Sequence, residues 1–270
     1  MEQTCHDPEL KHPCGALAGI RHFSNGTTPE STLEERAQYY AMIEEEDKLI
    51  GQARAAWKAY LEKKGAKGIF IYLSDHRDHM GDKGLFGKQT LFELSAHIPM
   101  IIQIDDCAHQ EVQTPVSIMD IGETLCALTG APRLPYSEGK DLSPAIFGQG
   151  TVVRPVISEI LGTGRDGRND SMGTMVRQGD YKLITYRGWE EEDLLFNIAE
   201  DPQERSNLVR ELPEVYAALK AIAAEHAVGE EVKIKRALEC VGPGSNVSIL
   251  TQYGRRHPEL LSEVWLMQEQ

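Results

Sequence analysis

Two residues with the chemistry of metal ligands, Asp75 and His76, stand side by side where an apolar run ends. The run, Ile69–Leu73, is rich in β-branched and aromatic side chains and predicts a strand buried on both faces. In open α/β sheets, ligands bind outside the carboxyl ends of the strands. A carboxylate suits Ca²⁺, Mg²⁺ or Mn²⁺, and an imidazole shifts the preference toward Mn²⁺, Zn²⁺ or Fe. The pair is therefore a candidate for part of a metal site, and hydrogen bonding within the fold is the competing explanation.

The glycine-punctuated loop after the pair offers a cation and more ligands. Lys88 can fold back toward the strand end, and Asp78, His79 and Asp82 are additional donors. The formal net charge of the chain is −14. An anionic substrate would therefore need a local cationic site made by lysine, arginine or a metal set into an acidic body.

A helix and further strands must position this loop. Capping-box signals at Ser31 and Thr32 predict a long helix that runs to about residue 64 and is ended by Gly65. Its apolar side chains recur every three or four residues and should face the sheet: Tyr39, Ile43, Ile50, Ala53, Trp57 and Tyr60. A strand at 99–104 and a helix at 118–129 follow. This alternation predicts an α/β domain, part of a mostly parallel sheet flanked by helices, over residues 32–131.

After a Pro/Gly/Ser-rich connector at 132–150, the alternation of helix and strand gives way to a series of short strand candidates. A small antiparallel sheet with a covering helix is expected over 151–228, with a hairpin turn at 178–180. Its strand candidates are 152–160, 172–177, 181–186 and 194–198, and the helix spans 213–227. Residues 1–31 form an irregular N-terminal segment, and the tail, 229–270, has no assignment.

Composition excludes several classes of protein. The negative charge argues against nucleic acid or an anionic membrane surface as a partner, and no run approaches the ~20 apolar residues of a membrane span. The start has no secretory signal, and five scattered cysteines favour a reduced interior, so we expect a cytoplasmic location. Four residues near the start invite a zinc site but fit no standard spacing: Cys5, His6, His12 and Cys14.

Several segments together carry a family resemblance. They are Tyr-Tyr-Ala-Met-Ile at 39–43, Ser-Asp-His at 74–76, Gly-Asp-Lys-Gly-Leu-Phe-Gly-Lys at 81–88, Pro-Val-Ser-Ile-Met-Asp-Ile at 115–121, Met-Val-Arg at 175–177, Gly-Asp-Tyr-Lys-Leu-Ile at 179–184, Leu-Phe-Asn at 195–197 and Asp-Pro-Gln-Glu at 201–204. In this order and spacing, the chain resembles the C-terminal portion of the sulfatases, in the alkaline-phosphatase-like superfamily. The resemblance extends from about residue 36 to about residue 207.

The resemblance implies functions for three residues. Asp75 and His76 would ligate a divalent cation, Ca²⁺ as in most sulfatases or Mn²⁺ as in phosphonate-ester relatives. Lys88 would bind the oxygens of a small-molecule sulfate ester and offset charge on the leaving group. The implied activity is hydrolysis of sulfate monoesters. The alternative is hydrolysis of phosphonate monoesters or phosphodiesters, toward which an Asp-His pair leans.

Two departures from the family pattern limit these implications. Arg77 stands where the family usually has glycine. The family's N-terminal metal ligands and the nucleophilic cysteine of its C-x-P-x-R motif have no counterpart, since neither Cys5 nor Cys14 fits that motif. Two ligands and a lysine supply no nucleophile, so we expect the chain alone to be inactive. It would then need a missing N-terminal portion or a second copy, or it is a non-catalytic remnant.

Overall fold

The computed structural model describes residues 28–88, 90–105, 107–135, 137–150, 153–161, 172–186 and 192–240, the last of these without side chains from residue 227 on. The side chains of Leu161 and Met172 are likewise not described. The chain divides into two compact units, Met1–Glu211 and Leu212–Gln270. None of the described helices is long and apolar enough to cross a membrane.

The first element, helix α2 (Pro29–Lys64), begins slightly earlier than predicted. Thr28 is its N-cap and forms a capping box with Ser31, while Pro29 occupies the first turn, where its missing N–H costs nothing. Gly65 ends the helix in a left-handed conformation, as predicted (φ 62°).

The apolar stripe of α2 does not form the predicted core contact. Among the described side chains of this helix only Leu61 is buried, whereas Ile43 is 49% and Tyr60 51% exposed. The reason lies in the adjacent strands, because a two-stranded ribbon offers too little surface to cover a helix of this length.

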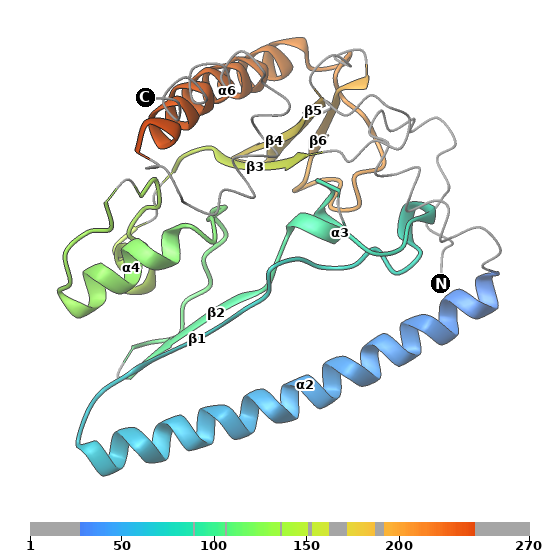
Figure 1. Cartoon of the computed structure of the whole chain (residues 1–270). Helices are drawn as coiled ribbons and strands as arrows, with labels where there is room; N and C mark the ends of the chain where they lie inside the picture. Colours follow the sequence, from blue (N-terminus) through green and yellow to red (C-terminus); the bar gives the residue numbers. More distant parts are fainter. Residues whose placement is uncertain are drawn as a thin grey trace, which may run out of the picture. The chain divides into compact units, whose positions relative to one another are not determined.

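Strand β1 (Ile69–Leu73) pairs with β2 (Met100–Ile104), and the two lie side by side in Figure 1. Their pairing is antiparallel, with Ile71 opposite Ile102. All the pairings between described strands are antiparallel, so the expected parallel sheet is not found among them. An uninterrupted apolar run does not specify strand direction, which explains the error. The predicted burial of β1 on both faces is not found either, since all five of its residues are only partly buried. The loop between the strands contains a 3₁₀ turn, η1 (Asp82–Gly84), and a short helix, α3 (Glu93–Ala96).

The predicted second sheet is present. Strands β3 (Val156–Leu161), β4 (Met172–Gln178), β5 (Tyr181–Tyr186) and β6 (Leu194–Asn197) form an antiparallel meander in that order. The core of the first unit lies on this sheet and includes Met175, Ile184, Tyr186 and Phe196 together with Leu91 and Phe92 from the loop before α3. The loop that carries the site residues is thus packed against the C-terminal sheet.

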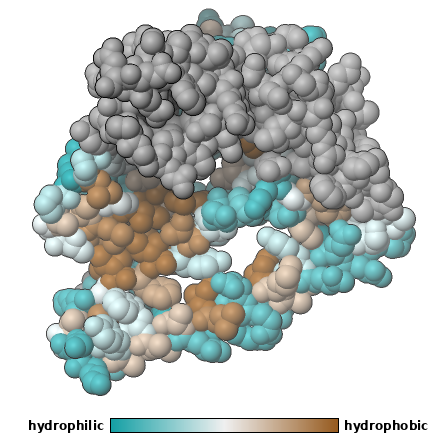
Figure 2. Space-filling view, in the orientation of Figure 1, coloured by the Kyte–Doolittle hydropathy of each residue, from teal (hydrophilic) through white to brown (hydrophobic). Residues whose placement is uncertain are grey.

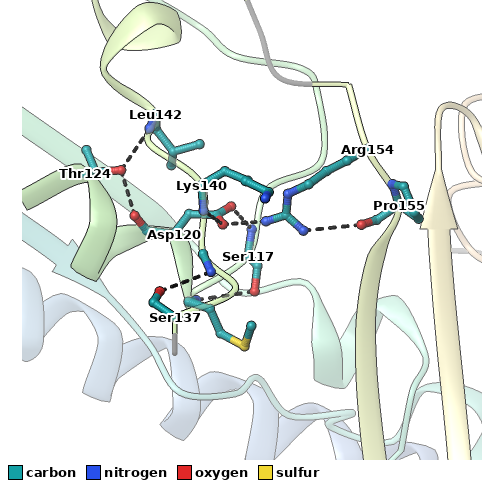
Figure 3. Close-up of polar contacts among 10 residues, drawn as sticks. Ser117, Asp120, Thr124, Ser137, Lys140, Leu142, Arg154 and Pro155 are labelled. Carbon is teal, nitrogen blue, oxygen red and sulfur yellow. Dashed lines mark hydrogen bonds and ion pairs between the residues drawn. The ribbon is translucent and has the colours of Figure 1, made fainter. Parts of the chain in front are cut away.

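The buried carboxylate of Asp120 links the segments that connect the first sheet to the second. Helix α4 (Asp120–Thr129) begins with Asp120, which is 1% exposed. Its carboxylate accepts hydrogen bonds from the backbone N–H groups of Ser117 and Lys140, each 2.8 Å, and pairs with Arg154 just before β3 (Figure 3). A short helix, α5 (Ser143–Ile146), follows in the same connector. One side chain therefore fixes α4, the connector and the start of the second sheet relative to each other.

The second unit contains α6 (Pro213–Cys240). The helix predicted at 213–227 is confirmed in position and is longer than expected, since it continues into the region for which no element was predicted.

Candidate active site

Lys88 returns to the end of β1 because its loop closes on itself. The backbone N–H of His79 donates to the carbonyl of Gly87 (2.9 Å), and the Asp78 carboxylate accepts from the N–H of Gly87 (3.2 Å). The residues that follow His76 are therefore bonded to the residue that precedes Lys88. Glycines with positive φ at positions 81, 84 and 87 make this tight path possible.

The three predicted site residues converge at this point. The Lys88 Nζ lies 2.5 Å from His76 Nε2, and that nitrogen is 3.4 Å from Asp75 Oδ2. Since an ammonium group only donates, His76 Nε2 is the acceptor and the ring proton resides on Nδ1, 3.1 Å from the carbonyl oxygen of Arg77. In this tautomer the Nε2 lone pair accepts from Lys88, so a cation could bind there only after the ammonium group moves away.

The electrostatics keep Asp75 ionised. Some desolvation raises the pKa of the carboxyl, but backbone hydrogen bonds of Asp75 and His76 and the positive charge of Lys88 outweigh it, so that the pKa lies below its ordinary value. The Asp75 side chain is 83% exposed and His76 36% exposed, so both are accessible from solvent.

The donor set fits part of a divalent-cation site. Two ligands at a right angle around an ion with bonds of about 2.3–2.6 Å are separated by about 3.3–3.7 Å, which matches the 3.4 Å between Asp75 and His76. A carboxylate oxygen and a neutral imidazole nitrogen are also suitable donor types. No group of three or more potential ligands occurs among the described residues, so these residues alone do not make a complete metal site.

The other predicted donors serve the loop itself. Asp78 accepts backbone N–H groups, and Asp82 pairs with Arg36 of α2 at 2.7 Å. His79 is fully buried against Thr90, 2.7 Å from its hydroxyl. Arg77 does not have positive φ, so its replacement of the family's glycine causes no strain of that kind. Cys5, His6, His12 and Cys14 lie outside the described residues.

Supporting residues of the loop were missed by the sequence analysis. Lys182 of β5 is fully buried and pairs with Glu93 (2.7 Å) and Glu204 (2.8 Å). The detectable signal was a lysine inside an otherwise apolar strand, Tyr-Lys-Leu-Ile at 181–184, because a buried lysine requires an anionic partner. Its partners lie far away in sequence and left no comparable signal.

Comparison with known proteins identifies the family. The sulfatase family model matches residues 4–131. Arylsulfatase K of Danio rerio is 30% identical over 210 residues, which cover 76% of this chain and 39% of that protein. Human arylsulfatase K is 30% identical over 236 residues, covering 81% and 44%. The chain belongs to the sulfatase family. It spans about two fifths of the length of these curated relatives.

Solved structures of related hydrolases share the fold of this chain. The phosphonate monoester hydrolase of Agrobacterium radiobacter is 27% identical, with a TM-score of 0.62 over 76% of this chain and 43% of that one. A 2-O glycosaminoglycan sulfatase, BT1596, is 22% identical with a TM-score of 0.52, covering 60% and 36% of the two chains. The α/β fold with helices beside its sheets is thus that of sulfatase structures.

One expectation is overturned by the family assignment. The predicted cytoplasmic location is wrong, since kinship with vertebrate arylsulfatases K does not support it. The prediction failed because a low cysteine count argues only against a framework of many disulfides and does not identify the compartment. Sulfatases generally use a divalent metal, in agreement with the donor types at Asp75 and His76.

Proposed function

We propose that this chain supplies part of the active site of a sulfate monoester hydrolase, with Asp75 and His76 as cation ligands and Lys88 as the anion-binding residue. The observation that carries the proposal is the convergence of these three side chains at the end of β1. A cation held there, Ca²⁺ in the leading version, would polarise an oxygen of the ester group. Lys88 would bind the remaining oxygens and offset negative charge on the leaving group.

The nucleophile and the missing cation ligands would come from a further polypeptide segment. Two protein ligands do not complete a shell of six or more oxygens and nitrogens. The uniformly apolar β1 and the exposed stripe of α2 provide a surface for such a segment, and strands that pair parallel to β1 would complete the expected sheet. Figure 2 shows that hydrophobic residues gather on this face of the chain. The described portion alone is therefore expected to bind ligands but not to turn over.

A direct test is calorimetry of the whole chain with Ca²⁺ and Mn²⁺, followed by inorganic sulfate. We expect Asp75→Asn to weaken cation binding by about tenfold or more, since a charged ligand is lost. Lys88→Met should abolish sulfate binding and spare the cation. The matched control is Asp47→Asn, an exposed carboxylate of α2. If Asp75→Asn and Asp47→Asn bind the cation equally well, the assigned site is wrong.

The second candidate is a phosphonate monoester or phosphodiester hydrolase. It is favoured by the Asp-His pair and by the similarity to the Agrobacterium enzyme. Parallel titrations with sulfate and methylphosphonate would separate the two candidates, because tighter binding of the phosphonate favours this one. A chain that binds neither cation nor anion would instead be a non-catalytic remnant. Coding sequence directly upstream of Met1 is informative as well, because an in-frame C-x-P-x-R segment would identify the nucleophile.

A further inference from the structure

A buried cluster of charged residues lies behind the Lys88 loop. It consists of Lys182, Glu93 and Glu204, of which Lys182 is 0% and Glu204 1% exposed. The Lys182 ammonium is 2.7 Å from Glu93 Oε1 and 2.8 Å from Glu204 Oε1. These residues come from β5, from α3 and from the turn after β6, so the cluster connects three separate segments.

Glu204 contacts the loop on both sides of Lys88. Its Oε2 accepts a hydrogen bond from the backbone N–H of Glu93 (2.8 Å), and its carbonyl oxygen accepts one from Lys83 Nζ (2.6 Å). Lys83 precedes Lys88 by five residues, and Glu93 follows it by five. The Lys83 ammonium also lies over the Phe92 ring, 4.7 Å from its centroid. The backbone around Lys88 is thus held at two points by one residue of the C-terminal sheet region.

Two of the residues that make these contacts have strained backbone conformations. Lys83 and Glu204 have φ angles of 55° and 54°, a left-handed conformation that costs about 1 kcal/mol for such residues. Strained residues persist only where the surroundings determine them. Of the three described non-glycine residues with positive φ, two therefore join the loop to the turn after β6, and the third, Met80, lies within the loop (φ 49°).

The charges of the cluster nearly balance. Arg177 of β4 lies opposite Lys182 in the sheet and its charge interacts with both carboxylates, and His97 lies 3.0 Å from Glu93. Burial raises the pKa of Glu93, but the hydrogen bond from His97 and the charge of Lys182 outweigh it and lower the pKa to about 2. For Glu204, burial prevails over the charge of Lys182 and raises the pKa. Without Lys182, the two carboxylates would repel each other.

A buried ion cluster is a weak source of stability, because apolar residues of the same volume often stabilise a fold as well or better. Its retention is better explained by the specific geometry it imposes. We propose that Lys182 and Glu204 are positioning residues, which hold the backbone on both sides of Lys88 so that its ammonium group faces Asp75 and His76. The purpose of that position, anion binding by Lys88, rests on the function proposed above.

The test measures the loop directly, by hydrogen exchange of the whole chain with correction for intrinsic rates. At about pH 7.5, Lys182→Met should speed exchange of the amides of residues 77–92 about tenfold or more, relative to those of β4 and β5. Lowering the pH to about 5 should restore slow exchange, because Glu93 and Glu204 can then share a proton. A merely structural role predicts equal acceleration in the sheet and no recovery. Either result overturns the proposal.

Two further variants keep the test decisive. Arg154→Met removes the cation from another buried carboxylate, Asp120, and should leave the loop unchanged. Lys83→Met removes the contact with Glu204 together with the cation–π contact with Phe92, leaves Lys182 in place, and should speed exchange before Lys88 even if Lys182→Met does not fold. An unchanged loop in Lys83→Met contradicts the proposal. Sulfate titration distinguishes the positioning role from the proposed function. If the wild-type protein binds no sulfate but the variants still show these exchange changes, the proposed function is wrong and the positioning role of Lys182 and Glu204 stands.

Discussion

The ammonium group of Lys88 alters the chemistry of its neighbours because it lies against His76 and near the exposed carboxylate of Asp75. Its charge is one of the causes that lower the pKa of Asp75. Lys88→Met should therefore shift the pKa of Asp75 back toward its ordinary value. A pH titration followed by carboxyl carbon NMR measures this shift. Lys140→Met serves as the control, and an unchanged Asp75 pKa in Lys88→Met would mean that the ammonium is elsewhere in solution.

His79 makes a second prediction at this scale. It is fully buried, and burial lowers its pKa from the usual 6.5 to about 4. Between these values the unfolded chain binds more protons than the folded one, so stability is greatest above about pH 6.5 and falls as the pH approaches about 4. The full loss is about 3 kcal/mol.

Urea unfolding between about pH 7 and pH 5 should detect much of this loss, in a range above the ordinary pKa of 4.5 at which Glu93 titrates in the unfolded chain. His79→Gln keeps a donor for Thr90 and should remove most of the slope, whereas His109→Gln, at an exposed position, should retain it. Equal slopes in the two variants would show that His79 is protonated in the folded protein.

Among the elements, α4 and the start of β3 depend on one carboxylate. Asp120 accepts two backbone N–H groups and pairs with Arg154 (Figure 3). Asp120→Asn keeps the size but removes the charge, so the free energy of unfolding should fall by about 2–3 kcal/mol. Chemical denaturation measures the change. Asp141→Asn, which affects a less buried carboxylate that caps Ser143, should cost about 1 kcal/mol or less.

Local elements were predicted better than their pairing. The four strands of the second sheet and the ends of α2 and α4 follow from short-range patterns, such as Gly65 and Gly130 in left-handed conformations. The direction of β2 against β1 was not encoded in their apolar runs. Contacts such as Lys182 with Glu93 join residues far apart in sequence, and no local pattern specifies them. The convergence of Lys88 with His76 was suggested by the glycines of the loop, and the resemblance of the loop to that of sulfatases made it a specific prediction.

At the scale of the whole chain, apolar side chains of the described residues of α2 and β2 are left exposed to solvent. In the described residues, β1 pairs with β2 alone, and α2 exposes Tyr40 and Met42 by 63% and 62%. A two-stranded ribbon is marginal in water, and an open apolar edge favours association with other chains. The exposed apolar surface of α2, β1 and β2, on which a further segment would pack, therefore also makes the isolated chain prone to self-association.

Sedimentation velocity over a wide range of protein concentrations should show this association. Ile101, on β2, is 62% exposed, so a double variant with Ile101→Lys and Met42→Lys should weaken it by about tenfold or more, because both changes place a charge on the apolar surface. Val153→Lys is the matched control, since Val153 is 75% exposed and lies outside α2, β1 and β2. If the control reduces association as much as the double variant, general charge is responsible, and the surface of α2 and β2 has no special part. If the wild-type chain is monomeric throughout, these apolar side chains are covered within the chain itself, and no further segment is needed to shield them.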